Sequence, residues 1–116
     1  MRHFSKFLNN NIMKHQSAFC GIKVCWIVLG DGTELSIQAG GHNYCSPRVT
    51  FKHPQFQRYK SFEIGFPSKV IEELLPYAEN TEIPCDTVYG WVPKKVIAEV
   101  IRKHGGIKGF IDPTIK

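Results

Sequence analysis

Side chains able to react or to bind a ligand are concentrated in residues 36–48, Ser-Ile-Gln-Ala-Gly-Gly-His-Asn-Tyr-Cys-Ser-Pro-Arg. The segment begins as a strand and breaks at a double glycine. It then places an imidazole, a phenol, a thiol and a guanidinium within seven positions. These residue types are compatible with a thiol nucleophile, a zinc site, or a site for an anionic ligand.

The first interpretation is a small enzyme that uses Cys45 and His42. A thiolate is a strong nucleophile, and a nearby imidazole can accept its proton. The arrangement requires a lowered cysteine pKa, and side chains three apart in a loop rarely pair as nucleophile and base. The alternative is a half-buried cysteine without a catalytic role.

The second interpretation is a zinc site formed by Cys20, Cys25, His42 and Cys45, which are ligands of a suitable type. The spacings argue against it, since Cys25 falls inside an expected strand and the chain has no Cys-x2-Cys pair. We therefore predict no metal and no cofactor.

The third interpretation is a site for an anionic ligand, and it rests on basic and aromatic residues interleaved across 42–60. Guanidinium groups bind phosphate in a bidentate manner, and aromatic rings stack on bases. The net charge of +5 favours the same class of partner. The alternative is a solvated basic loop whose rings are anchored in the core. The predicted ligand-binding residues are His42, Tyr44, Arg48, Arg58, Tyr59 and Trp91.

The 116 residues are 42% hydrophobic and 22% charged, which is typical of one globular domain. No apolar run approaches the roughly 20 residues of a membrane-spanning helix, and the N-terminus lacks the apolar core of a secretory signal. We expect a cytoplasmic protein with reduced cysteines. Residues 1–18 contain basic residues and no acid, which predicts a flexible tail before a single domain at 19–116.

Alternating hydrophobic residues predict the strands that position these side chains. An Asp31-Gly32 turn joins the first two strands, and Gly90 indicates a bulge or a close backbone approach. The expected strands are 21–29, 33–39, 59–66, 87–92 and an edge strand at 107–111.

Two helices are expected after the third and fourth of these strands. Ser68 is a suitable N-cap for a short helix at 69–75, and Pro76 ends it. Pro93 fits the first position of the second helix. The apolar positions are Val70, Ile71 and Leu74 in the first helix, and Val96, Ile97, Val100 and Ile101 in the second. The pattern predicts an α+β domain whose mostly antiparallel sheet of four or five strands carries both helices on one face.

Six segments of the chain are distinctive: Ser36–Ala39, Tyr44–Arg48, Glu63–Ser68, Leu75–Glu79, Val88–Pro93 and Lys103–Gly106. Together they resemble a group of small uncharacterised proteins of phages and prophages. The similarity covers about residues 22–107 and implies no known activity. It implies an accessory phage protein that acts inside a bacterial cell, a class that often counters host defence.

These observations favour a protein that binds rather than catalyses. The leading hypothesis is a homo-oligomeric phage anti-defence protein that sequesters a cyclic or modified nucleotide. The alternative is a protein–protein inhibitor of a host defence effector such as a CRISPR nuclease. Many such inhibitors mimic DNA with acidic surfaces, whereas here the acids cluster only at 79–86.

Overall fold

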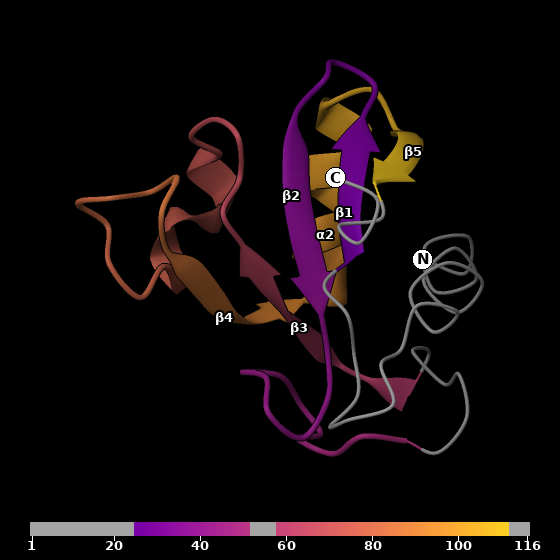
Figure 1. Cartoon of the computed structure of the whole chain (residues 1–116), viewed down its shortest axis with the longest axis vertical. Helices are drawn as coiled ribbons and strands as arrows, with labels where there is room; N and C mark the ends of the chain where they lie inside the picture. The colour runs from indigo at the N-terminus through magenta and orange to yellow at the C-terminus, as the bar shows by residue number, and fades with distance from the viewer. Residues whose placement is uncertain (1–24, 52–57, 112–116) are drawn as a thin grey trace.

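The computed structural model describes residues 25–51 and 58–111, and within them five strands form one antiparallel sheet (Figure 1). The strand order is β4-β3-β2-β1-β5. The expected tail at 1–18, Cys20 and the start of the first expected strand lie outside the described residues. The strands are β1 (Cys25–Leu29), β2 (Glu34–Gln38), β3 (Ser61–Gly65), β4 (Val88–Pro93) and β5 (Ile107–Ile111).

Two helices lie within the described residues, and together with the sheet they confirm the predicted α+β class. The 3-10 helix η3 (Glu72–Tyr77) precedes β4, and the α-helix α2 (Lys94–Lys103) connects β4 to β5. Figure 1 shows α2 behind β1 and β2. The apolar stripe of α2 is confirmed, because Ile97 and Val100 are buried in the core and Val96 and Ile101 pack against it. Pro93 is the N-cap of α2, one position before the predicted one.

The β1–β2 hairpin has the turn predicted at Asp31-Gly32. Gly32 adopts a φ of 90°, and the Asp31 Oδ1 atom accepts a hydrogen bond of 2.9 Å from the Thr33 backbone N–H. The end of α2 contacts the same turn: the Gly30 and Asp31 N–H groups donate to the Gly106 and His104 carbonyls, each at 2.9 Å. The hairpin and the C-terminal part of the domain are therefore held together by backbone hydrogen bonds.

The short helix differs from its prediction of residues 69–75. It begins after Ile71 and contains Pro76 instead of ending before it. Ser68 does not cap it, because its Oγ atom accepts a hydrogen bond of 2.8 Å from the Glu34 backbone N–H. Because Ser68 is bonded to β2, the helix begins later than predicted. Val70, which was expected on the apolar face of the helix, is half exposed. No helix in the described segments is long and apolar enough to cross a membrane.

Candidate functional site

A bulge in β4 directs Trp91 to the surface. In the β3–β4 register Phe62 pairs with Val92 and Ile64 with Tyr89, so two residues of β4 lie opposite Glu63. The bulge predicted at Gly90 is therefore confirmed. Trp91 has a φ of 52°, a left-handed conformation that is uncommon outside glycine, and its side chain is 52% exposed. Bulges reorient side chains in this way and are frequent beside functional sites.

Three of the predicted ligand-binding residues form one cluster around this bulge, which we term the aromatic cluster: Tyr44, Arg48 and Trp91. The Tyr44 and Trp91 rings are stacked, with centroids 5.2 Å apart and an interplanar angle of 28°. The Arg48 guanidinium carbon lies 5.1 Å from the centre of the Tyr44 ring. The Trp91 N–H also donates to the Tyr44 carbonyl at 2.9 Å, which fixes the two backbones relative to each other.

Gly90 allows this close approach. A Cβ atom at position 90 would lie 3.1 Å from the Tyr44 Cβ atom, tighter than an ordinary van der Waals contact. The absence of a side chain at Gly90 thus lets the Tyr44 ring lie against β4 and reach Trp91.

Two other predicted residues lie in a separate group. Tyr59 is buried, its hydroxyl donates to the Val49 carbonyl, and burial raises the pKa of this hydroxyl to about 12. The Arg58 guanidinium lies over the Phe51 ring, 4.4 Å from its centre, and the Phe51 ring contacts Tyr59 edge-on. The buried Tyr59 ring therefore has no face available for stacking on a base. The two arginines lie over different rings.

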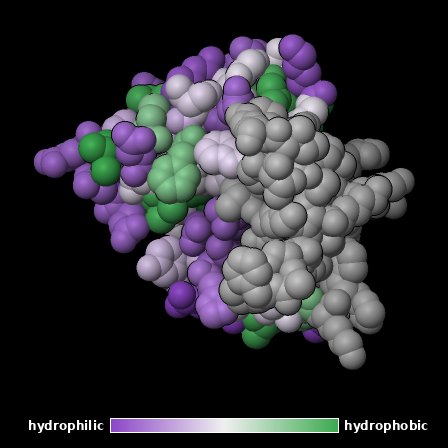
Figure 2. Space-filling view, in the orientation of Figure 1, coloured by the Kyte–Doolittle hydropathy of each residue, from purple (hydrophilic) through white to green (hydrophobic). Residues whose placement is uncertain are grey.

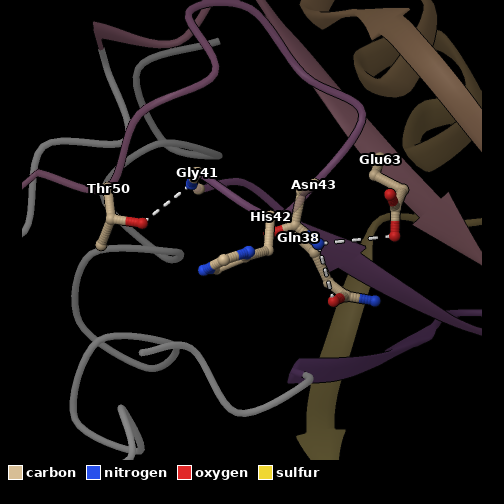
Figure 3. A pocket seen from close by; sticks show the side chains of 7 residues that line it. Gln38, Gly41, His42, Asn43, Thr50 and Glu63 are labelled. Atoms are coloured by element: carbon tan, nitrogen blue, oxygen red, sulfur yellow. Dashed lines mark hydrogen bonds between the residues drawn. The ribbon is translucent and has the colours of Figure 1, made fainter. Parts of the chain in front are cut away.

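His42 lines a polar pocket of about 340 Å³. Figure 3 shows its imidazole extending into the space between Thr50 and Gln38. His42 is exposed, whereas Glu63 on the floor is only 8% exposed. The described lining residues are Gln38, Gly40, Gly41, His42, Asn43, Thr50 and Glu63.

Hydrogen bonds donated to Glu63 hold the loop against the sheet. Its Oε1 atom accepts from the Tyr44 backbone N–H at 2.8 Å, and its Oε2 atom accepts from the Asn43 side chain at 3.4 Å. Asn43 also donates to the Gln38 Oε1 atom at 3.1 Å (Figure 3). Glu63 thus supports both the pocket and, through Tyr44, the aromatic cluster. The sequence interpretation missed it, although an acid inside an apolar strand was the available signal.

Cys45 is placed as a buried structural thiol. Its Sγ atom donates to the Gly40 and Pro47 carbonyls, each at 3.4 Å, and accepts from the Gly40 N–H at 3.3 Å. Burial raises the pKa of this thiol, the opposite of what a nucleophile needs. Among the described residues no group of three or more His, Cys, Asp or Glu side chains is arranged to hold a metal ion.

We expect Cys45 to be protected from alkylation. In the native protein it should react with iodoacetamide at least about a hundredfold more slowly than in the urea-unfolded chain, because reaction requires local opening. Peptide mass spectrometry resolves its labelling from that of the half-buried Cys85, which should react first. A native Cys45 that reacts as fast as in the unfolded chain would restore the nucleophile interpretation.

A second hollow, of about 460 Å³, lies at the predicted acidic segment. Phe66 and Ile83 are exposed hydrophobic residues on its wall, with Glu79 and Asp86 beside them. Phe66, like Trp91, has a positive φ, of 50°. Figure 2 shows hydrophobic side chains on this face among hydrophilic ones, on the side of the molecule where β4 and its preceding loop lie.

Comparison of the chain with protein-family models, with curated proteins and with solved structures finds no match.

Proposed function

We propose that the protein binds a nucleotide-type ligand at the aromatic cluster. The observation that carries the proposal is the conformation of Trp91, an exposed indole held at a positive φ by a bulge and stacked on Tyr44. Unfavourable backbone conformations persist where the surroundings enforce them, and they concentrate at functional sites. The exposed half of Trp91 offers an aromatic surface on which a ligand can stack.

The chemistry of the cluster selects the class of ligand. An exposed indole face favours any planar π-system, and stacking on a base contributes about 1–3 kcal/mol. Arg48 adds a guanidinium, whose donors match phosphate oxygens. A nucleotide offers both groups in one molecule. The net charge of +5 attracts such an anion at long range.

The identity of the nucleotide, the purpose of binding it and the oligomeric state are predictions. The resemblance to phage proteins suggests that the nucleotide is a cyclic or modified host signal and that binding sequesters it. Trp91 lies on β4, an edge strand of the sheet. A second copy next to this edge would enclose the ligand more fully, which is the reason we retain the homo-oligomer in the proposal.

Tryptophan fluorescence tests the proposal directly. In a Trp26→Phe background Trp91 is the single tryptophan of the chain, so its quenching reports stacking. Titration with mononucleotides, cyclic dinucleotides and cyclic trinucleotides should give saturable quenching by at least one of them. Calorimetry should then show that Trp91→Ala weakens binding of that nucleotide about 5- to 150-fold.

The two arginines provide a matched control. Arg48→Ala should weaken binding of the nucleotide but not of the corresponding nucleoside, which lacks the phosphate. Arg58→Ala removes the same charge from over the Phe51 ring and should change affinity by no more than about twofold. The proposal is wrong if no nucleotide quenches Trp91, or if both alanine variants lose the same affinity.

Protein binding is the second candidate function, and the Phe66 hollow favours it. Exposed Phe66 and Ile83 beside Glu79 and Asp86 suit a partner with apolar and basic side chains. Ile83→Asp should abolish stoichiometric capture of a host protein, whereas Val70→Asp, at another half-exposed hydrophobic position, should not. Equal capture by both variants would argue against this surface.

A further inference from the structure

We infer that the Glu63 pocket is a binding site of its own, for a planar group that presents two N–H donors side by side. The Watson–Crick edge of guanine and the guanidinium of an arginine-type compound share this chemistry. The inference rests on the hydrogen bonds, charge and size of the pocket. It does not require the stacking proposed at Trp91.

The polar side chains of the pocket present acceptors to a ligand. Both hydrogens of the Asn43 amide are already used, one by Gln38 Oε1 at 3.1 Å and the other by Glu63 Oε2 at 3.4 Å. The Gln38 amide nitrogen donates to Ser36 Oγ at 3.4 Å. On Asn43 and Glu63 only acceptors remain, namely the Asn43 carbonyl oxygen and the second lone pair of each Glu63 oxygen. The second hydrogen of the Gln38 amide is left as a donor beside them. At Glu63 itself the ligand must therefore supply the donors.

The charge of the pocket leads to the same conclusion. Glu63 is 8% exposed, and within residues 25–51 and 58–111 no lysine or arginine forms an ion pair with it or lines the pocket. A carboxylate removed from water without a cationic partner is costly. Charge-assisted hydrogen bonds from a ligand would offset this cost, and two parallel N–H groups match a carboxylate best.

The size of the pocket limits the ligand to a small group. A volume of about 340 Å³ lies at the lower end of the range for small-molecule sites, enough for one base or one guanidinium head with its stem. His42 lies over this space (Figure 3) and, within the described part of the chain, has no hydrogen-bond partner in the structure. Its imidazole is thus available to contact whatever enters.

Two ligand series distinguish the sources, and both use the full-length chain. The first compares guanosine with inosine, which lacks the 2-amino donor, and with adenosine, whose edge presents an acceptor at N1. The second compares agmatine with a urea analogue that has no positive charge. Ligand-observed NMR and calorimetry measure the affinities. Either guanosine should bind at least about tenfold more tightly than inosine and adenosine, or agmatine should bind at least about tenfold more tightly than its urea analogue.

Variants then assign the binding to the pocket. Glu63→Gln keeps the side-chain shape and should weaken binding of the ligand that binds, guanosine or agmatine, at least about tenfold. Glu72→Gln, at an exposed acid outside both proposed sites, should change nothing. If Glu63→Gln lowers the melting temperature, Thr50→Lys replaces it. Thr50 is exposed at the pocket, and a lysine there would neutralise Glu63 and displace the ligand, with the same expected loss.

The outcomes separate this inference from the proposed function. If neither guanosine nor agmatine binds, or if binding survives both Glu63→Gln and Thr50→Lys, the inference is overturned. A third outcome would also overturn the inference but leave the aromatic cluster intact. In that outcome nucleotides quench Trp91 equally whatever their base, and Glu63→Gln does not change the quenching. Binding that depends on Glu63 and is unchanged in Trp91→Ala would support the pocket alone.

Discussion

Replacing Gly30 with alanine should lower the free energy of unfolding by about 3–5 kcal/mol, enough to unfold much of the protein. An added Cβ atom would lie 2.3 Å from the Gly105 carbonyl oxygen, 2.7 Å from its carbonyl carbon and 2.9 Å from its Cα atom. All three are backbone atoms, so no side chain can rotate away. The clash would separate the β1–β2 turn from the end of α2 and break the 2.9 Å bond between Gly30 N–H and the Gly106 carbonyl.

Gly32→Ala is the matched control for this substitution. Gly32 lies two positions away in the same turn, has a φ of 90°, and has nothing within 4 Å of an added Cβ atom. Gly32→Ala should lower the free energy of unfolding only by the cost of placing alanine in a left-handed backbone conformation, about 1–2 kcal/mol. Urea unfolding followed by circular dichroism measures both losses, and equal losses would contradict the importance of the Gly30–Gly105 approach.

Replacing Phe62 with alanine should have the second largest effect, a loss of about 3–5 kcal/mol. Phe62 is fully buried, pairs with Val92 across the sheet and packs against the Tyr59 ring at 5.8 Å. Removing its ring leaves a cavity in the core below the bulge, which the surrounding strands cannot fill. The melting temperature should fall accordingly.

Phe66→Ala is the control for the loss of an aromatic ring. Phe66 is 42% exposed whereas Phe62 is fully buried, so truncation of Phe66 removes less buried area and should cost only about 1 kcal/mol. Alanine at position 66 keeps the positive φ of Phe66, so the comparison measures the loss of the ring. Comparable losses at positions 62 and 66 would mean that the core does not depend on Phe62.

The fold was largely predictable because its determinants are local. Alternating hydrophobic residues and the Asp31-Gly32 turn are contained in short segments, and they located all five strands to within a few residues. The helix at 69–75 was predicted incorrectly because Ser68 has a non-local partner. Its hydroxyl bonds the backbone of Glu34, which lies 34 positions earlier, and no local rule includes that contact.

The candidate site was predictable only in part, for a related reason. The types of Tyr44, Arg48 and Trp91 indicated their chemistry, and the structure brings them together. Tyr59 and Tyr44 are both tyrosines, so their side chains alone do not distinguish them. Only the packing of the chain places Tyr59 in the core and Tyr44 at the surface. Glu63 was missed because its role depends on the loop that crosses above it.

The strand order has a consequence for how the chain is made. The meander from β1 to β4 consists of neighbours in sequence and can assemble while translation proceeds. Its partners on the other side of β1 are α2 and β5, which leave the ribosome last among the described elements. A nascent chain that stalls before them would leave Ile27 and Leu29 uncovered and one side of β1 unpaired, a template for aggregation. Folding of the sheet can therefore finish only after α2 and β5 have left the ribosome, and until then chaperones can protect the open side of β1.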